Sequence, residues 1–225
     1  MSGIPSSLHR TVDELKESVA VLHAELPRNN LVVWTAGNVS ARVPGADLLV
    51  IKPSGVSYVD ITPASMVVCD LDGNLVEGDR KPSSDTAAHA YVYRHMPEVG
   101  GVVHTHSDYA TAWAACREPI PCALTMIADE FGGEIPIGPF ALIGDDSIGR
   151  GIVETLRESR SRAVLMANHG PFTIGTDARD AVKAAVMVED IARTMHLARQ
   201  LGTPVPIDAA DIDSLFARYQ HVYGQ

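Results

Sequence analysis

Residues 66–76 read Met-Val-Val-Cys-Asp-Leu-Asp-Gly-Asn-Leu-Val, and this stretch decides what kind of sheet the chain forms. The apolar run 66–69 is typical of a buried strand, and Asp72-Gly73-Asn74 is a turn sequence that lets the chain reverse into Leu75-Val76. Two strands joined by so short a turn run antiparallel. The stretch therefore predicts a β-hairpin rather than a strand–helix–strand unit.

Short apolar runs of the same kind occur on both sides of this hairpin. Residues 31–34 and 48–51 precede it, and residues 100–106, 163–168 and the stretch up to Ile174 follow it. Because hairpins outnumber strand–helix–strand units in this pattern, we expect a mixed α/β protein whose sheet is largely antiparallel. The polar residues 37–40 are expected to form a turn after the first of these strands.

Helical periodicity fills much of the remaining sequence. Thr11 is expected to cap a first helix, whose apolar face recurs every three to four residues until Pro27 ends the pattern. Further helices are expected at residues 85–96, 107–116, 177–201 and 207–219. No internal repeat or linker divides the chain, so we expect residues 1–225 to form one domain.

Composition and charge exclude several classes of protein. Hydrophobic residues make up 46% of the chain and charged residues 20%, the balance of a globular protein with one substantial core. Eighteen basic against 28 acidic residues give a formal net charge of −10, which opposes nucleic acid as a partner. No apolar stretch reaches the roughly 20 residues of a membrane helix, and no secretory signal begins the chain. With three cysteines and no paired motif among them, we expect a soluble cytoplasmic protein with reduced thiols.

Three of the nine histidines lie where a metal ion could be bound. His104 and His106 are two residues apart on a predicted strand, so their side chains leave the same face with Cα atoms about 6.6 Å apart. His169 ends another apolar strand in the same manner. Three histidines at strand ends leave open positions for water and substrate, as a catalytic metal requires. Solvated or capping roles are expected for three histidines in polar or amphipathic settings: His9, His23 and His196.

Three small polar turns offer groups that bind an anion. Lys81-Pro-Ser-Ser-Asp-Thr86 precedes a predicted helix, where Ser83 or Ser84 can act as cap and the free N–H groups attract a phosphate. Lys52-Pro-Ser-Gly55 supplies a cation, a hydroxyl and a glycine that admits a ligand close to the backbone. Together with residues 37–40, these turns predict a phosphate site beside the predicted metal site.

Six short motifs follow one another along the chain. They are Thr35-Ala-Gly-Asn-Val-Ser40, Ile51-Lys-Pro-Ser-Gly55, Glu77-Gly-Asp-Arg-Lys-Pro-Ser-Ser-Asp-Thr86, Gly101-Val-Val-His-Thr-His106, Asn168-His-Gly-Pro171 and Val222-Tyr-Gly-Gln225. In this order they resemble the motifs of the class II aldolase superfamily, and most closely those of its L-ribulose-5-phosphate 4-epimerases. The resemblance implies an α/β/α fold around a mainly antiparallel central sheet. It also implies a homotetramer with active sites at subunit interfaces and one divalent metal ion per subunit.

The resemblance assigns a role to each motif by position. It makes His104, His106 and His169 metal ligands, with Asp85 as the acidic residue beside them. It gives phosphate binding to seven positions: Gly37, Asn38, Lys52, Ser54, Gly55, Ser83 and Ser84. It also implies two acid/base groups, which we expect to be Asp129 from the chain that holds the metal and Tyr223 from a neighbouring subunit. Imidazoles suit Zn²⁺, Mn²⁺ or Co²⁺, and a carboxylate adds tolerance for Mg²⁺; zinc is the ion we expect.

The activity that the resemblance implies is the interconversion of L-ribulose 5-phosphate and D-xylulose 5-phosphate. The implied route is retro-aldol cleavage and aldol re-addition through a metal-stabilised enediolate, so the expected partner is a small phosphorylated sugar. A class II aldolase that cleaves L-fuculose 1-phosphate is an alternative, as is a dehydratase or decarboxylase relative. Asp85 favours the epimerase, because the aldolases of this resemblance tend to carry Glu there. A non-catalytic module like the adducin head domain is disfavoured by the presence of all three histidines.

Overall fold

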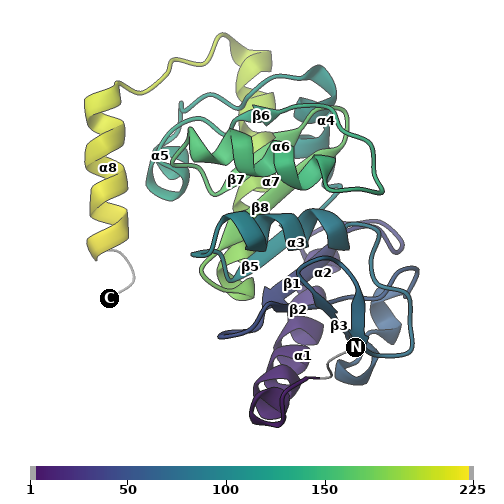
Figure 1. Ribbon diagram of the computed structural model, residues 1–225. Coiled ribbons are helices and arrows are strands. Elements are labelled where there is room, and N and C mark those ends of the chain that lie inside the picture. Colours follow the sequence, from purple (N-terminus) through teal and green to yellow (C-terminus); the bar gives the residue numbers. More distant parts are fainter. Residues whose placement is uncertain (1–3, 223–225) are drawn as a thin grey trace.

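The computed structural model describes residues 4–222, whose strands form one eight-stranded sheet (Figure 1). The strands are β1 (Asn38–Arg42), β2 (Leu48–Ile51), β3 (Val67–Asp70), β4 (Leu75–Glu77), β5 (Gly101–His104), β6 (Ile137–Gly138), β7 (Ala163–Met166) and β8 (Gly170–Gly175). They lie in the order β4-β3-β2-β1-β5-β8-β7-β6, and every neighbouring pair is antiparallel except β6 and β7. The mainly antiparallel sheet is confirmed, with one parallel pair at its edge that the sequence did not predict.

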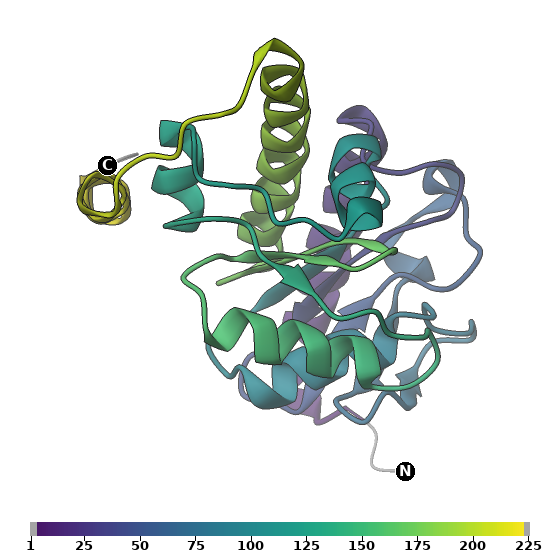
Figure 2. The same ribbon diagram turned by 90° about the horizontal axis from the view of Figure 1, so that it is seen from above.

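Helices cover both faces of this sheet (Figure 2). They are α1 (His9–His23), α2 (Glu25–Arg28), α3 (Thr86–His95), α4 (Asp108–Cys116), α5 (Thr125–Phe131), α6 (Ser147–Arg157), α7 (Ala178–Leu201) and α8 (Ala209–Val222), with 3₁₀ turns at Ser6–Leu8, Tyr58–Asp60 and Pro63–Ser65. Helices α3 and α6 share a core with Val102 and Phe172 on one face. Helices α1, α4, α5 and α7 pack in two cores with Val103 and Leu165 on the other. No helix among residues 4–222 is long and apolar enough to cross a membrane.

Strands β5 and β7 explain why the sequence contains apolar runs rather than an alternating pattern. Val102 of β5 lies in the core under α3 and α6, while Val103 lies in the core under α1 and α7. On β7, Val164 and Leu165 divide between the two faces in the same way. A strand that is buried on both faces needs apolar residues at successive positions. This is why short apolar runs predicted these strands correctly.

The predictions of a strand at residues 31–34 and of a turn at residues 37–40 are wrong. Residues 31–34 form a loop, in which Trp34 is exposed and has a φ of +59°. The strand begins at Asn38, within the segment expected to be a turn. Asn38 and Ser40 are polar yet buried on one face of β1, where Asn38 donates to Asp85, the N-cap of α3, and Ser40 bonds His89 of α3. The polar residues of β1 therefore looked like a turn in the sequence, because their buried partners come from a helix far along the chain.

Helix boundaries also differ from the expectation in places. Thr11 is not a cap: α1 begins at His9, and its N-cap position is Leu8 at the end of the preceding 3₁₀ turn. Pro27 lies inside the short helix α2 rather than ending a helix. Helices α5 and α6 and strand β6 were not predicted. In α6, a Cβ at Gly149 would lie 2.6 Å from the Tyr91 Cβ, so this glycine permits close packing rather than breaking the helix.

Candidate metal and phosphate site

Three histidines meet where β5 ends and where β7 turns into β8. His104 is the last residue of β5, His106 follows two residues later, and His169 directly precedes β8. The Nε2 atoms of His104 and His106 are 2.9 Å apart. One ring nitrogen from each of the three histidines lies within 4.8 Å of the others. The sequence prediction that these side chains share one site is therefore met in the structure.

The turn that carries His169 is fixed by the end of α4. Asn168 has a φ of +57°, and its backbone N–H donates to the carbonyl of Ala114 at 2.9 Å. Arg117, at the end of the same helix, donates from Nε to the Asn168 Oδ1 at 2.7 Å. Gly170 must lack a side chain, because a Cβ there would lie 2.7 Å from the carbonyl oxygen of Thr105. These contacts bring β8 close to the residue between His104 and His106.

His104 is prepared to act as a ligand by its surroundings. It is 1% exposed, its ring stacks on Phe172 at 4.1 Å between centroids, and its Nδ1 is 3.1 Å from the carbonyl of Pro171. A carbonyl only accepts, so Nδ1 carries the proton and Nε2 presents its lone pair to the cluster. Burial lowers the pKa of His104 to about 3 and also lowers the pKa of His106 and His169. All three imidazoles are neutral at pH 7, the form that binds a metal.

The donor set fits a divalent metal ion. Of the three neutral imidazoles, that of His169 has a buried Nε2 with no hydrogen-bond partner among the described residues, so this atom is free to bind a metal. Asp85 lines the same cavity, and its Oδ1 is likewise buried without a partner, although the carboxylate is not part of the 4.8 Å group. Burial alone would raise the pKa of Asp85, but the neighbouring His104 and His89 and a hydrogen bond from Asn38 hold it below its usual value. A carboxylate beside three imidazoles suits Zn²⁺, Mn²⁺ or Co²⁺.

The predicted phosphate positions gather in the same cavity as the histidines. This cavity has a volume of about 290 Å³, and its lining includes all seven of them: Gly37, Asn38, Lys52, Ser54, Gly55, Ser83 and Ser84. The two serine-containing turns are joined by backbone hydrogen bonds from Ser54 to Lys81 (2.8 Å) and from Ser83 to Lys52 (3.1 Å). Ser83 was expected as a helix cap, but the N-cap position of α3 is Asp85. The Ser83 Oγ accepts from the Asn38 Nδ2 at 3.0 Å and, at a long 3.4 Å, from the Asp85 N–H.

Lys52 provides a buried positive charge at this cavity. It is 2% exposed, and its Nζ donates to the carbonyl of Thr35 at 2.9 Å and lies 5.4 Å from the centre of the Tyr58 ring. Among residues 4–222, no carboxylate lies within ion-pair distance of Nζ. Burial lowers the pKa of Lys52, and Asp85 partly offsets this effect. An ammonium held in this way gains most from an anionic ligand, because a buried charge without a partner is costly.

Gly37 brings the backbone of the third turn close to the metal site. Its φ is +77°, and a Cβ there would lie 2.9 Å from the carbonyl oxygen of His104 and 2.6 Å from Val32. The hydroxyl of Tyr58 holds the turn by donating to the carbonyl of Ala36 at 2.7 Å. Only glycine fits this position, so the loop and the end of β5 can share one wall of the cavity.

Comparisons with known proteins identify the family of the chain. Residues 17–196 match the family model described as the class II aldolase and adducin N-terminal domain. The chain belongs to this class II aldolase family. It is 42% identical to proteins named L-ribulose-5-phosphate 4-epimerase UlaF from Salmonella paratyphi B and Salmonella typhi, with 92% of this chain and 95% of each relative covered. A solved L-fuculose 1-phosphate aldolase superposes with a TM-score of 0.86 at 29% identity, over 92% of this chain and 96% of the aldolase.

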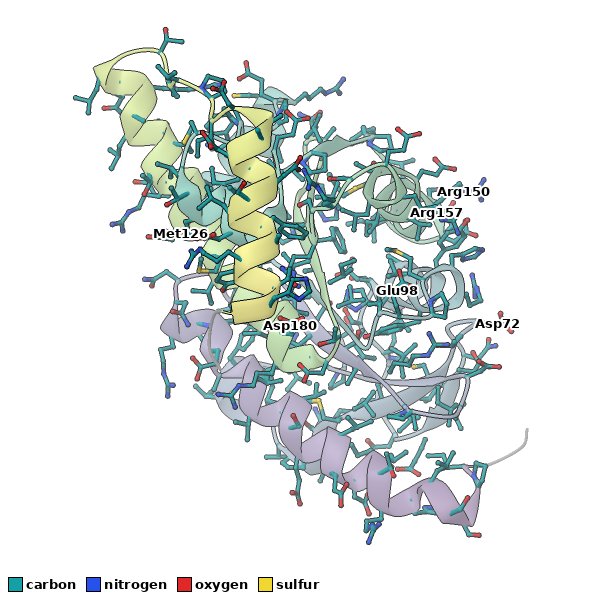
Figure 3. The ribbon with its side chains drawn as sticks, turned by 90° about the vertical axis from the view of Figure 1, so that its left-hand side faces the viewer. Asp72, Glu98, Met126, Arg150, Arg157 and Asp180 are labelled. Atoms are coloured by element: carbon teal, nitrogen blue, oxygen red, sulfur yellow. The ribbon has the colours of Figure 1, made fainter. Side chains whose placement is uncertain are left out.

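Within this class II aldolase fold, Asp129 lies away from the histidines. It is on α5, and it faces Arg218 of α8, whose Nη2 is 3.4 Å from the Asp129 Oδ1. It lines a separate cavity of about 170 Å³ together with Met126 and Tyr219, and no residue lines both this cavity and the 290 Å³ cavity. Figure 3 looks onto this edge, with α8 in front and Met126 beside it. Asp129 therefore does not line the histidine cavity of its own chain, and its acid/base role stays a prediction.

The other predicted acid/base group, Tyr223, lies outside the described residues. Helix α8 ends at Val222, directly before it, and Asp129 is paired with Arg218 of the same helix. The next residue after Asp129, Glu130, is buried and pairs with Lys183 at 2.7 Å, which anchors α5 to α7. A larger hollow of about 890 Å³ beside α5, β6 and α6 contains none of the predicted site residues.

Two further buried histidines were missed at the sequence level. His23 was expected to be solvated or capping, but it is 0% exposed: its Nδ1 donates to Val19 and its Nε2 accepts from the Val39 N–H. His89 is also 0% exposed and bonds Ser40 of β1. The only local signal for His89 was its position one helical turn after Asp85.

Proposed function

We propose that this class II aldolase family member is an epimerase that interconverts L-ribulose 5-phosphate and D-xylulose 5-phosphate. The observation that carries the proposal is one cavity that combines three convergent imidazoles with the seven positions predicted to bind phosphate. The relatives named L-ribulose-5-phosphate 4-epimerase, 42% identical over most of the chain, support the same activity. The expected cofactor is one divalent ion per subunit, zinc first, with manganese, cobalt or magnesium as alternatives.

The chemistry of the substrate explains why such a site is needed. C4 of a 2-ketopentose is not adjacent to the ketone, so its hydrogen is not acidic and simple proton exchange cannot invert this carbon. The C4 hydroxyl is β to the ketone, however, and its deprotonation allows the C3–C4 bond to break. A bound divalent ion, held by His104, His106 and His169, supplies Lewis-acid stabilisation for the charge that develops on the ketone oxygen.

The residues of the phosphate turns act on the other half of the substrate. After cleavage, the phosphate remains on a two-carbon aldehyde, which must stay bound while its carbonyl turns to present the opposite face. Lys52 supplies positive charge, and Ser54 and Ser83 supply hydroxyls within the same cavity. Backbone N–H groups at the start of α3 add anion-binding donors. Re-formation of the C3–C4 bond then gives the C4 epimer.

Two acid/base groups are required, one for each face of the aldehyde. Asp129 lines a cavity between α5 and α8, separate from the histidine cavity of its own chain, and α8 ends at Val222, directly before Tyr223 in the sequence. We therefore assign both groups to the site of a neighbouring copy, which replaces the mixed arrangement expected from the sequence. This assignment calls for a homo-oligomer, and a homotetramer is the assembly that we propose.

An aldolase that cleaves L-fuculose 1-phosphate is the second candidate. The TM-score of 0.86 to a protein of that name supports it, because the two chains share one backbone fold over 92% of this chain. The residue at position 85 favours the epimerase, because it is Asp in this chain, whereas such aldolases tend to carry the longer Glu there.

Product analysis separates the two candidates. The metal-loaded protein is incubated with L-ribulose 5-phosphate and with L-fuculose 1-phosphate, and the products are separated by chromatography. The epimerase converts the first substrate into D-xylulose 5-phosphate and leaves the second intact. Release of dihydroxyacetone phosphate from L-fuculose 1-phosphate, without epimerisation of the pentulose, would establish the aldolase instead. The His104→Ala variant, assayed in parallel, controls for activity from a contaminating enzyme.

A further inference from the structure

Helix α3 lies on strand β1 through two parallel pairs of buried polar side chains. Asn38 donates from Nδ2 to the Asp85 Oδ2 at 2.7 Å, and Ser40 Oγ lies 2.7 Å from the His89 Nδ1. Asn38 and Ser40 are two residues apart and share one face of the strand, while Asp85 and His89 are one helical turn apart. None of the four side chains is more than 7% exposed. The first pair belongs to the proposed metal site, and the second lies directly behind it.

The hydroxyl of Tyr93 decides which nitrogen of His89 carries the proton. Ser40 Oγ lies 2.7 Å from the Tyr93 hydroxyl as well as 2.7 Å from the His89 Nδ1. Ser40 is the only side-chain partner of the Tyr93 hydroxyl within the described chain. Burial raises the pKa of Tyr93 and the backbone bond at Val102 lowers it, so at that bond the Val102 N–H donates and the Tyr93 oxygen accepts. Both hydroxyl protons then have an acceptor when Tyr93 donates to Ser40 and Ser40 donates to Nδ1. Nδ1 is then an acceptor, and the proton of the neutral imidazole is on Nε2.

The Nε2–H of His89 and the Oδ1 of Asp85 are complementary groups without partners. Within the described chain, both atoms are buried and neither has a hydrogen bond. A buried polar atom without a partner costs about 1–3 kcal/mol. One group is a donor and the other is an acceptor, and Asp85, the N-cap of α3, is four residues before His89.

We propose that His89 is a positioning residue for Asp85. The two side chains form no hydrogen bond in the structure, and a rotation of the Asp85 carboxylate on ion binding lets its Oδ1 accept from the His89 Nε2–H. This inference rests on the proposed metal site. With Asn38 on Oδ2 and His89 on Oδ1, the carboxylate is held at both oxygens. Each oxygen keeps a free lone pair for an ion bound by the histidines. Hydrogen bonds to ligating groups typically change metal affinity by 10–100-fold.

Two substitutions separate this role from simple packing. In His89→Gln, the side-chain amide can place an N–H where Nε2 stands and so still reach Asp85. In His89→Asn, the shorter amide occupies the position of Nδ1 and reaches only Ser40. Both variants replace the imidazole by a neutral amide, so each controls for the loss of the ring in the other. Urea unfolding of the metal-free proteins measures any general loss of stability.

The experiment has two decisive readouts. The first is the ring ¹⁵N chemical shifts of His89, and the second is the affinity of the protein for Co²⁺, measured from the visible absorption of the bound ion. The inference predicts an Nε2–H tautomer in the wild-type protein. It also predicts a Co²⁺ affinity that is about 10–100-fold weaker in His89→Asn but close to wild type in His89→Gln. An Nδ1–H tautomer, or equal loss of affinity in both variants, would overturn the role of His89 while leaving the metal site intact. Absence of Co²⁺ binding by the wild-type protein would overturn the proposed metal site and this inference together.

Discussion

The buried His23 makes the stability of the fold depend on pH in a way that one substitution can isolate. Its Nδ1 donates to the Val19 carbonyl at 2.7 Å, and its Nε2 accepts from the Val39 N–H at 3.0 Å. It thereby joins the last turn of α1 to β1, with no exposed surface. Burial lowers the pKa of His23 to about 3, although its bond to Val19 opposes the change, and the nearby Lys52 and His89 lower it further. Tyr58 is the third titratable group near the ring.

The size of the effect follows from the difference between the folded and unfolded pKa values. Below pH 6.5 the unfolded chain binds a proton at His23 and the folded chain does not, so acid favours unfolding. At pH 5 the unfolded pKa lies about 1.5 units above the pH, and each unit corresponds to about 1.4 kcal/mol. His23 should therefore remove about 2 kcal/mol of stability between pH 8 and pH 5, and this loss continues until the folded pKa near 3 is reached.

Urea unfolding of wild type and His23→Gln at pH 8 and pH 5 measures this contribution. A chelator keeps both proteins metal-free, and one fixed protein concentration keeps any effect of self-association equal. The other histidines with lowered pKa titrate in both proteins, so they cancel in the difference. Wild type should lose about 2 kcal/mol more than His23→Gln on acidification. Equal losses in the two proteins would refute the assignment of a buried, neutral His23.

Three further predictions concern the site. His104→Ala and His169→Ala should each lose the tightly held metal ion, measured by plasma emission, while their far-UV circular dichroism stays unchanged. The control His196→Ala, which replaces an exposed histidine, should keep the ion. One ion per subunit in all three variants would disprove the three-histidine site. Ser83→Ala should raise KM more than it lowers kcat, as expected for uniform phosphate binding, and an unchanged KM would remove that role. Inactive Tyr223→Phe and His104→Ala subunits should regain partial activity when mixed, because hybrid interfaces would contain one complete site; no recovery at any ratio would exclude sites shared between copies.

Much of the fold was predictable because the strands have local signatures. The hairpin of β3 and β4 and the apolar strands β5 and β7 were found from short runs and a turn sequence. Strand β1 was missed, because Asn38 and Ser40 resemble turn residues until Asp85 and His89, 45 or more positions later, pack against them. A pattern within a few residues cannot contain a partner that only the tertiary fold provides.

The site residues divide in the same way, into those placed by local structure and those placed by tertiary packing. His104, His106 and the phosphate turns could be predicted, since side chains at strand ends or helix starts owe their position to local structure. The location of Asp129 could not be predicted, because it depends on how α5 packs against α8 at a distance from the cavity. His23 was misjudged for a related reason: its acceptor role depends on a backbone N–H of β1.

The central claim, that this site inverts C4 by breaking and re-forming the C3–C4 bond, is tested most directly by reaction in D₂O. The metal-loaded protein is given L-ribulose 5-phosphate, and NMR identifies the product and the isotope at its C4. The account predicts D-xylulose 5-phosphate that retains hydrogen at C4, because no C4–H bond is broken. Deuterium at C4 would contradict the cleavage route, and the absence of the epimer would contradict the proposed activity.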